Sequence, residues 1–175
     1  MLDTAKLIGV SVANPPTVKN LRPQMPQASY GQGQVVVTPF QMARVASAVA
    51  AAGQLPFGKW VIDESNSRVQ PPQAIVSAND AALLAKDMRS VVTSGTGRRL
   101  AAIKPDIAGK TGTAELAVAP SHAWFIGFAP YTDTPQAAHR IAFAVLAENG
   151  HYGGTAAAPI AGDLVLAAKQ LGLIQ

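Results

Sequence analysis

The sequence predicts an α+β fold in which an antiparallel sheet is covered by helices on both faces. Three apolar runs in the second half of the chain, at 107–114, 122–129 and 141–148, have the length of strands. Their apolar residues are nearly continuous rather than alternating, which is typical of a sheet that is buried on both faces. Helical patterns precede and follow these runs, so helices are available for both layers.

The first half of the chain is expected to be mainly helical. Residues 3–8 predict a short helix, whereas the Pro-containing segment 14–27 has no periodicity and predicts an irregular loop. The segment 38–41, Thr-Pro-Phe-Gln, has the residue types of a helix N-terminus with a capping box and with proline in the first turn. Gly53 is expected to end this helix.

The remaining elements frame the sheet. A short strand is expected at 60–63, Trp-Val-Ile-Asp, and a second helix at 79–93. A final helix is expected at 156–170, because Pro159 is tolerated in a first helical turn and Gly172 is a suitable helix end. This last helix should pack on the sheet.

Composition excludes several classes of function. The chain has 175 residues and no cysteine, which excludes disulfides, thiolate-bound zinc and thiol catalysis. Its formal charge of +4 is modest, and Arg98-Arg99 with Lys104 forms the only noticeable basic cluster, which predicts a solvated face. A nucleic-acid partner is not expected, because a basic stripe interleaved with aromatic residues is missing.

A metal site and a membrane-spanning segment are not expected either. His122, His139 and His151 have no ligand spacing with one another or with carboxylates, so no metal site is predicted. No uncharged apolar run approaches the ~18 residues of a membrane span. The start of the chain lacks the basic and apolar regions of an export signal, so we expect no signal or anchor in these residues.

The segment Lys110-Thr111-Gly112-Thr113 carries the clearest chemistry. It lies between the apolar run 106–109 and the strand-like run 122–129, which predicts a position on a strand that faces a cleft. An ammonium beside two hydroxyls and a glycine can receive a carboxylate: the lysine supplies charge, the threonines supply directional donors, and the glycine lets the ligand approach the backbone. The segment therefore predicts a site for an acidic end group.

Further motifs surround this segment in a specific order. They are Gly31-Gln32-Gly33, the segment 38–43 (Thr-Pro-Phe-Gln-Met-Ala), Gly95-Thr96-Gly97, the segment 108–115 and the segment 124–130. In this order and approximate spacing, the chain resembles the transpeptidase domain of high-molecular-weight penicillin-binding proteins, whose fold is shared with serine β-lactamases. The resemblance implies that residues 1–175 are the C-terminal portion of a single transpeptidase domain, with 1–30 as a loosely assigned lead-in.

One motif of that family is missing. Its nucleophile is the serine of Ser-x-x-Lys, and this spelling occurs nowhere in the 175 residues, so no nucleophile is found. The only Ser-x-Asn spelling, Ser77-Ala78-Asn79, comes after Gly31 rather than before it. We interpret it as a helix start, because Ser77 is followed three residues later by Asp80. The resemblance also implies that two further strands of the sheet are absent here.

The resemblance implies acyl transfer on a peptidoglycan stem peptide that ends in D-alanyl-D-alanine, without a cofactor. A serine would attack the penultimate carbonyl, and β-lactam antibiotics would trap that serine as substrate mimics. Lys110, Thr111 and Thr113 would hold the terminal carboxylate, and the backbone N–H of Thr113 would be half of the oxyanion hole. The implied location is the extracytoplasmic face of the bacterial inner membrane, and the missing N-terminal part of the domain is an implied partner.

Other polar and aromatic residues are weaker candidates. Glu115 could support the site, but a polar residue that leaves a strand explains it equally well. Trp124 and Phe125 could line the cleft, although aromatic residues in an apolar run are more often core. Residues 151–154, His-Tyr-Gly-Gly, are expected to form the loop that enters the last helix.

Three functions are compatible with these residues. The first is part of a D,D-transpeptidase that contributes the Lys-Thr-Gly half of the active site and forms no acyl-enzyme by itself. The second is a catalytically inactive module that recognises peptidoglycan stems. The third is a serine β-lactamase or β-lactam sensor domain, which shares Lys-Thr-Gly, although Gly31-Gln32-Gly33 and the segment 38–43 favour the transpeptidases.

Overall fold

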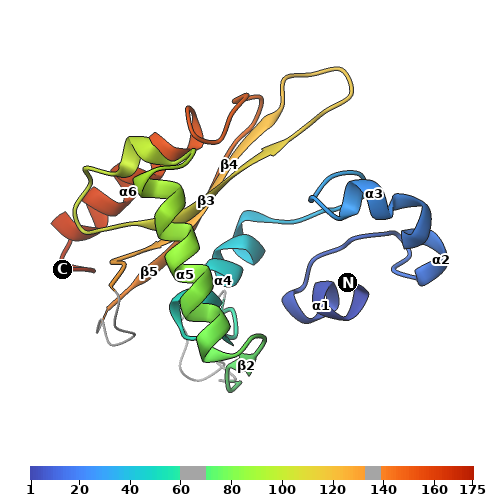
Figure 1. Ribbon diagram of the computed structural model, residues 1–175, viewed down its shortest axis with the longest axis horizontal. Coiled ribbons are helices and arrows are strands. Elements are labelled where there is room, and N and C mark those ends of the chain that lie inside the picture. Colours follow the sequence, from blue (N-terminus) through green and yellow to red (C-terminus); the bar gives the residue numbers. More distant parts are fainter. Residues whose placement is uncertain (60–69, 133–138) are drawn as a thin grey trace.

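The computed structural model describes residues 1–59, 70–132 and 139–175, and a three-stranded antiparallel sheet forms its centre (Figure 1). The sheet has the order β3-β4-β5, with β3 at Ala108–Ala114, β4 at His122–Ala129 and β5 at Ile141–Ala147. The three predicted strands are thus confirmed, with the first one beginning a residue later and the last one ending a residue earlier. In the described residues β3 pairs with β4 only, so its other edge is open.

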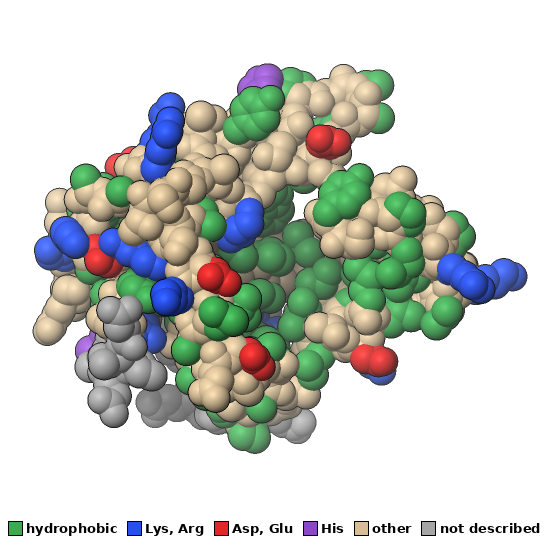
Figure 2. Space-filling view, viewed as in Figure 1, with side chains coloured by type: hydrophobic (Ala, Val, Ile, Leu, Met, Phe, Trp, Pro, Cys, Tyr) green, Lys and Arg blue, Asp and Glu red, His purple; other side chains and the backbone are tan. Residues whose placement is uncertain are grey.

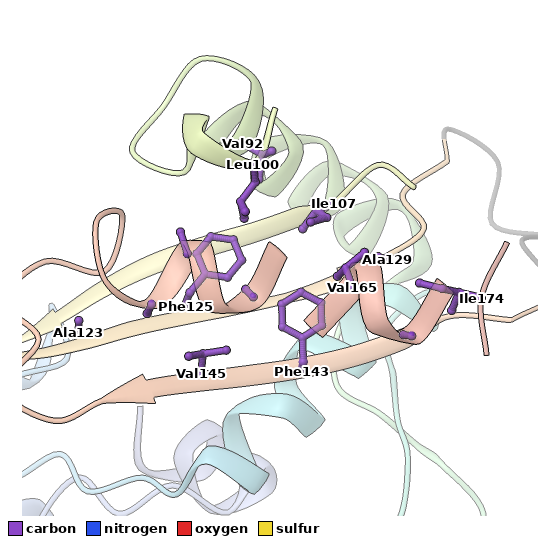
Figure 3. Close-up of a cluster of buried hydrophobic side chains, with 14 residues drawn as sticks. Val92, Leu100, Ile107, Ala123, Phe125, Ala129, Phe143, Val145, Val165 and Ile174 are labelled. Carbon is purple, nitrogen blue, oxygen red and sulfur yellow. The ribbon is translucent and has the colours of Figure 1, made fainter. Parts of the chain in front are cut away.

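A buried apolar core lies between the sheet and the last helix, α6 (Ala157–Gln170) (Figure 3). Phe125 of β4 and Phe143 of β5 stack in this core with their ring centroids 6.3 Å apart. Val165 of α6 packs against the same cluster and is fully buried. Each aromatic residue buries a large apolar area, so this layer provides the main hydrophobic stabilisation of the sheet.

Two further helices complete the covering of the sheet. Helix α4 (Pro39–Ala50) contacts β4 and β5 but contributes no residue to the core beside α6, which places it on the opposite face. Helix α5 (Ala78–Thr93) packs on β3. The predicted α+β arrangement, with helices on both faces of an antiparallel sheet, is therefore confirmed.

The predicted helix starts are also confirmed. Thr38 and Gln41 form a reciprocal capping box at the start of α4, with Pro39 in its first turn. The Ser77 hydroxyl accepts a hydrogen bond from the Asp80 N–H at 3.1 Å and so caps α5. The interpretation of Ser77-Ala78-Asn79 as a helix start is therefore confirmed. Each such cap contributes about 1 kcal/mol.

The first 36 residues form a separate lobe beside the sheet, which we call the N-terminal lobe (Figure 1). It contains α1 (Leu2–Ile8), α2 (Val18–Leu21), a 3₁₀ turn at Arg22–Gln24 and α3 (Met25–Ala28). A small buried cluster, Ala5, Val12, Ala13, Leu21 and Ala28, holds the lobe together. Figure 2 shows hydrophobic side chains gathered in the hollow between this lobe and the rest of the molecule.

The prediction of an irregular loop at 14–27 is wrong, because three short helical segments occupy most of it. Thr17 caps α2 by accepting a hydrogen bond from the Asn20 N–H at 3.2 Å. Pro23 and Pro26 stand in the first turns of the following segments, where proline is well tolerated. Helices of three or four residues are too short to produce a hydrophobic period, so the pattern could not reveal them.

The smaller elements connect the layers. A two-residue ladder joins β1 (Gln54–Leu55) to β2 (Gln73–Ala74), and a 3₁₀ turn, η2 (Arg98–Leu100), lies between α5 and β3. The strand predicted at 60–63 lies outside the described residues. No helix in the described ranges is both long enough and apolar enough to cross a bilayer.

Candidate active site at the open edge of strand β3

The alternation of β3 separates the four candidate residues of the Lys-Thr-Gly-Thr segment. Thr111 pairs with Phe125 and Thr113 pairs with Ala123, whose side chains belong to the buried core beside α6. Neighbouring side chains of a strand point to opposite faces, so Lys110 leaves β3 on the other face from the two threonines. The lysine and the hydroxyls therefore approach the strand edge from opposite sides.

A cavity of about 560 Å³ opens beside the two threonines. Three segments line it: the turn after α5 together with η2, strand β3, and the turn that precedes α6. Most of the lining groups are hydroxyls, glycines or guanidinium groups. The lining residues are Gly95, Thr96, Arg98, Arg99, Thr111, Thr113, Tyr152, Gly153, Gly154 and Thr155.

Two glycines bring the backbone of one cavity wall against its neighbours, Gly153 against the sheet and Gly154 against the turn after α5. A Cβ atom on Gly153 would lie 2.3 Å from the carbonyl oxygen of Trp124 and 2.7 Å from that of Gly112. A Cβ atom on Gly154 would lie 2.2 Å from the carbonyl oxygen of Thr96. Only glycine allows these approaches, so this pair sets the shape of the cavity. The sequence predicted a loop here but not its position in the site.

The hydroxyl of Thr111 has a defined position. Its Oγ1 lies 2.6 Å from Oγ1 of Thr96, a hydrogen bond that joins β3 to the turn after α5. A hydroxyl that is already held in place loses less conformational freedom when it binds a ligand. Thr96 was predicted only as part of a family motif, and the structure adds this contact with Thr111.

The cations near the cavity come from two places. Arg98 and Arg99 line the cavity from η2, although the sequence predicted only a solvated basic face for them. Lys110 is not among the lining residues; its Nζ donates a hydrogen bond to the carbonyl oxygen of Thr111 at 2.8 Å. The ammonium thus reaches the open edge of β3 from the opposite face.

The open edge of β3 exposes backbone groups of alternate residues. The carbonyl oxygens of Thr111 and Thr113 accept hydrogen bonds from side chains that do not belong to β4, so both face the open edge. Within a strand, the N–H and C=O groups of one residue point to the same side. The N–H of Thr113 therefore also faces this edge, beside the cavity that its side chain lines.

The other predicted candidates lie outside the cavity wall. Phe125 is fully buried and Trp124 is half-buried, and only Phe125 belongs to the core beside α6. Glu115 is exposed just beyond the end of β3. The three histidines lie apart from the cavity wall: Nδ1 of His122 accepts a hydrogen bond from the Asn149 N–H, and His139 and His151 are exposed. In the ranges that the structure describes, no three His, Asp or Glu side chains gather as metal ligands.

Comparison with known proteins assigns the family. The model of the penicillin binding protein transpeptidase domain matches residues 9–166. The chain belongs to the penicillin-binding protein transpeptidase family. The resemblance inferred from Lys-Thr-Gly and the surrounding motifs is thereby confirmed.

Similar proteins of this transpeptidase family come from several bacteria. The peptidoglycan D,D-transpeptidase PbpA of Mycolicibacterium smegmatis is 34% identical over an alignment of 162 residues, and the match covers 83% of this chain and 32% of that protein. The peptidoglycan D,D-transpeptidase MrdA of Acinetobacter baumannii is 33% identical over an alignment of 157 residues, and the match covers 74% of this chain and 22% of that protein. The chain thus spans a third or less of the length of these two relatives.

A solved structure supports the same assignment of the fold. Penicillin-binding protein A from M. tuberculosis, determined as an imipenem acyl-enzyme complex, superposes with a TM-score of 0.66. The two chains share 29% sequence identity, and the match covers 92% of this chain and 41% of that one. The sheet and its covering helices therefore have the arrangement of a penicillin-binding transpeptidase.

Proposed function

We propose that this chain supplies the carboxylate-binding and oxyanion side of a D,D-transpeptidase active site that cross-links peptidoglycan stem peptides. The main observation behind the proposal is the cavity at the open edge of β3. The side chains of Thr111 and Thr113 line this cavity, and the N–H of Thr113 faces the same edge. We propose that residues 1–175 act as the C-terminal portion of one transpeptidase domain. The nucleophilic serine would come from a Ser-x-x-Lys motif outside these residues.

The proposed substrate lies along the open edge of β3. Its terminal carboxylate accepts hydrogen bonds from the hydroxyls of Thr111 and Thr113, and Gly112 allows the close approach to the backbone. Lys110 contributes charge from one face of the strand, while Arg98 and Arg99 make the potential of the cavity positive from the other. This arrangement favours a peptide that ends in a free carboxylate.

The proposed chemistry is acyl transfer through a serine ester. The serine oxygen bonds to the carbonyl carbon of the penultimate D-alanine, and the bond to the terminal D-alanine breaks, with a proton passing to the departing amine. A second stem-peptide amine then takes the acyl group and releases the serine. The Thr113 N–H stabilises the oxyanion in both steps, and the loss of one such donor typically costs ~10²–10³ in turnover.

The substrate places the whole protein on the extracytoplasmic face of the bacterial inner membrane in this proposal, because stem peptides are cross-linked there. β-Lactam antibiotics are proposed ligands of the same cavity, since they imitate D-alanyl-D-alanine and carry a carboxylate. No cofactor is needed, because the ester and the oxyanion donors provide the chemistry.

Titration of the ¹⁵N,¹³C-labelled chain with N-acetyl-D-alanyl-D-alanine tests the carboxylate site. We expect chemical-shift changes at Thr96, Thr111 and Thr113, and weaker binding of the analogue whose terminal carboxylate is amidated. Equal affinity for the acid and the amide would contradict the proposal. Intact mass spectrometry after incubation with benzylpenicillin should show no adduct on the chain alone, and a stoichiometric adduct would show that the chain contains a nucleophile.

A second candidate function is a binding module that recognises stem peptides without acylation. The absence of Ser-x-x-Lys from these residues favours it. The two functions differ when the chain is mixed with a separately produced transpeptidase half that carries Ser-x-x-Lys. An active-site partner would restore penicillin acylation of that serine, whereas a binding module would leave the serine unmodified.

A further inference from the structure

Gln32 makes two hydrogen bonds with the open edge of β3. Its Nε2 donates to the carbonyl oxygen of Thr113 at 3.0 Å, and its Oε1 accepts from the N–H of Glu115 at 3.3 Å. The contacts span 81 and 83 residues of sequence. One carboxamide therefore bonds to the two backbone groups that flank Ala114, the carbonyl before it and the N–H after it, as a neighbouring strand would.

The backbone around Gln32 holds the side chain in this place. Gly31 and Gly33 have φ angles of 83° and 72°, which are unfavourable for residues with a side chain, so the chain turns sharply on both sides of Gln32. The N–H of Gln32 donates to the carbonyl oxygen of Gln27 at 2.9 Å, which anchors it to the end of α3. The Gly-Gln-Gly segment thus presents the carboxamide from the N-terminal lobe.

These contacts occupy the groups around the Thr113 N–H and leave that N–H accessible. The carbonyl of Thr111 is bonded by Lys110, the carbonyl of Thr113 by Gln32, and the N–H of Glu115 by Gln32. The N–H of Thr113 faces the same edge between these bonded groups. An oxyanion donor is effective when it is fixed before the reaction, because no reorganisation is then needed.

We propose that Gln32 is a positioning residue, which holds the end of β3 so that the Thr113 N–H points at the reacting carbonyl oxygen of the substrate. The proposal rests on the proposed function of the Thr113 N–H as an oxyanion donor. Gln32 itself contacts neither the threonine hydroxyls that bind the carboxylate nor the reacting atoms. It acts through the backbone of β3.

The test compares Gln32→Met with a matched control, Gln34→Met. Methionine has nearly the length of glutamine but no amide, so it removes both hydrogen bonds with little change in volume. Gln34 is exposed two residues further along the loop. The amides of Lys110 and Gly112, which belong to the β3–β4 pair, report whether the sheet remains folded.

The first readout needs no ligand. In Gln32→Met the hydrogen exchange of the Glu115 amide should accelerate about five- to tenfold, because one hydrogen bond is lost, while Gln34→Met should leave it unchanged. The second readout uses N-acetyl-D-alanyl-D-alanine as the probe. We expect Gln32→Met to lose the shift of the Thr113 amide but to keep the shifts of the Thr111 and Thr113 methyl groups, which report carboxylate binding.

The outcomes separate the two proposals. A wild-type chain in which neither set of resonances responds to the probe overturns the proposed function. A wild-type response that Gln32→Met retains in full at the Thr113 amide overturns the role of Gln32 alone. If Gln32→Met disturbs the sheet amides, Gln32→Glu is tested instead. This variant keeps an acceptor for the Glu115 N–H but removes the donor to the Thr113 carbonyl. If the Thr113 amide of Gln32→Glu still responds to the probe as in the wild type, the inference is overturned.

Discussion

Thr111 combines two functions at the scale of a single residue: it is a strand residue, and it holds a hydroxyl at a set position in the cavity. Its bond to Thr96 links two segments whose residues are 15 positions apart in sequence. The hydroxyl contributes little to folding, because both threonines have access to solvent. Its main effect should therefore be on ligand binding.

Thr111→Val should weaken the affinity for N-acetyl-D-alanyl-D-alanine about tenfold, since a hydrogen bond to a charged group is lost. Thermal unfolding should change by less than about 1 kcal/mol, because valine fills the same volume and suits a strand. Calorimetric titration measures the affinity. Thr93→Val at the exposed end of α5 is the control, and equal affinities in the two variants would contradict the role of Thr111.

Gly153 shapes the cavity because it has no side chain: its backbone lies against the sheet where a Cβ atom would not fit. Gly153→Ala should cost about 2–3 kcal/mol of unfolding free energy, because its Cβ would overlap two backbone oxygens of the sheet. Gly172→Ala is the control: that residue has a φ of 70° but open space around it, and should cost about 1 kcal/mol. Urea denaturation measures both values, and equal costs would show that the turn can move away.

Among the secondary-structure elements, partly buried arginines connect helices to strands. Burial lowers the pKa of the Arg140 guanidinium from its usual value by removing water from the charge. The side chain donates to the Ala50 carbonyl at 2.7 Å and lies over the Phe128 ring. Arg140 thereby attaches the start of β5 to the end of α4, since a charge taken from water requires such partners.

A second arginine attaches α5 to the start of β3. Arg89 pairs with Asp106 at 2.9 Å and donates to the Ile107 carbonyl at 2.9 Å. Arg89→Met should lower the free energy of unfolding by about 2 kcal/mol, because it removes the guanidinium donor from the Ile107 carbonyl and from the Asp106 carboxylate. Lys104→Met is the control, since Lys104 also contacts Asp106 but its side chain is 68% exposed, and it should cost less than about 0.5 kcal/mol. Chemical denaturation measures the free energy of unfolding of both variants. Equal losses in Arg89→Met and Lys104→Met would contradict the prediction.

At the scale of the whole molecule, the N-terminal lobe and the sheet have separate hydrophobic clusters. Two polar contacts hold the lobe near the rest of the chain: Gln41 donates to the carbonyl oxygen of Gly9, and Gln32 donates to that of Thr113. The lobe cluster consists of five small or medium side chains, far less apolar area than the core beside α6 provides. Local stability should therefore differ between the two parts.

Hydrogen exchange should reveal this difference. We expect amides of residues 2–28 to exchange through local opening, faster than those of β4 and α6, whose exchange should require global unfolding. Exchange measured by mass spectrometry at several urea concentrations separates the two cases: the α6 and β4 amides should depend strongly on urea, and the lobe amides weakly. Equal protection and equal urea dependence would mean that the lobe and the sheet unfold together.

Local patterns were sufficient to predict much of this molecule. The three strands follow from apolar runs of strand length, the starts of α4 and α5 follow from capping residues, and the family follows from motifs in order. The strands and the caps are each set by residues within about ten positions of one another, and the family motifs by their order along the chain, so both can be detected in the sequence. The short helical segments at 18–28 were missed because three or four residues make about one helical turn, which is too short to show a hydrophobic repeat.

Patterns along the chain were enough to predict the α+β class and the strands, and to mark the Lys-Thr-Gly segment as a carboxylate receptor to be tested. Which groups meet at that segment follows from the folded arrangement: Lys110 lies on one face of β3 and the threonines on the other, the Gly153 turn lies against the sheet, and Gln32 lies at the strand edge. These contacts join segments up to 83 residues apart. They depend on strand register and chain closure, which no local pattern encodes.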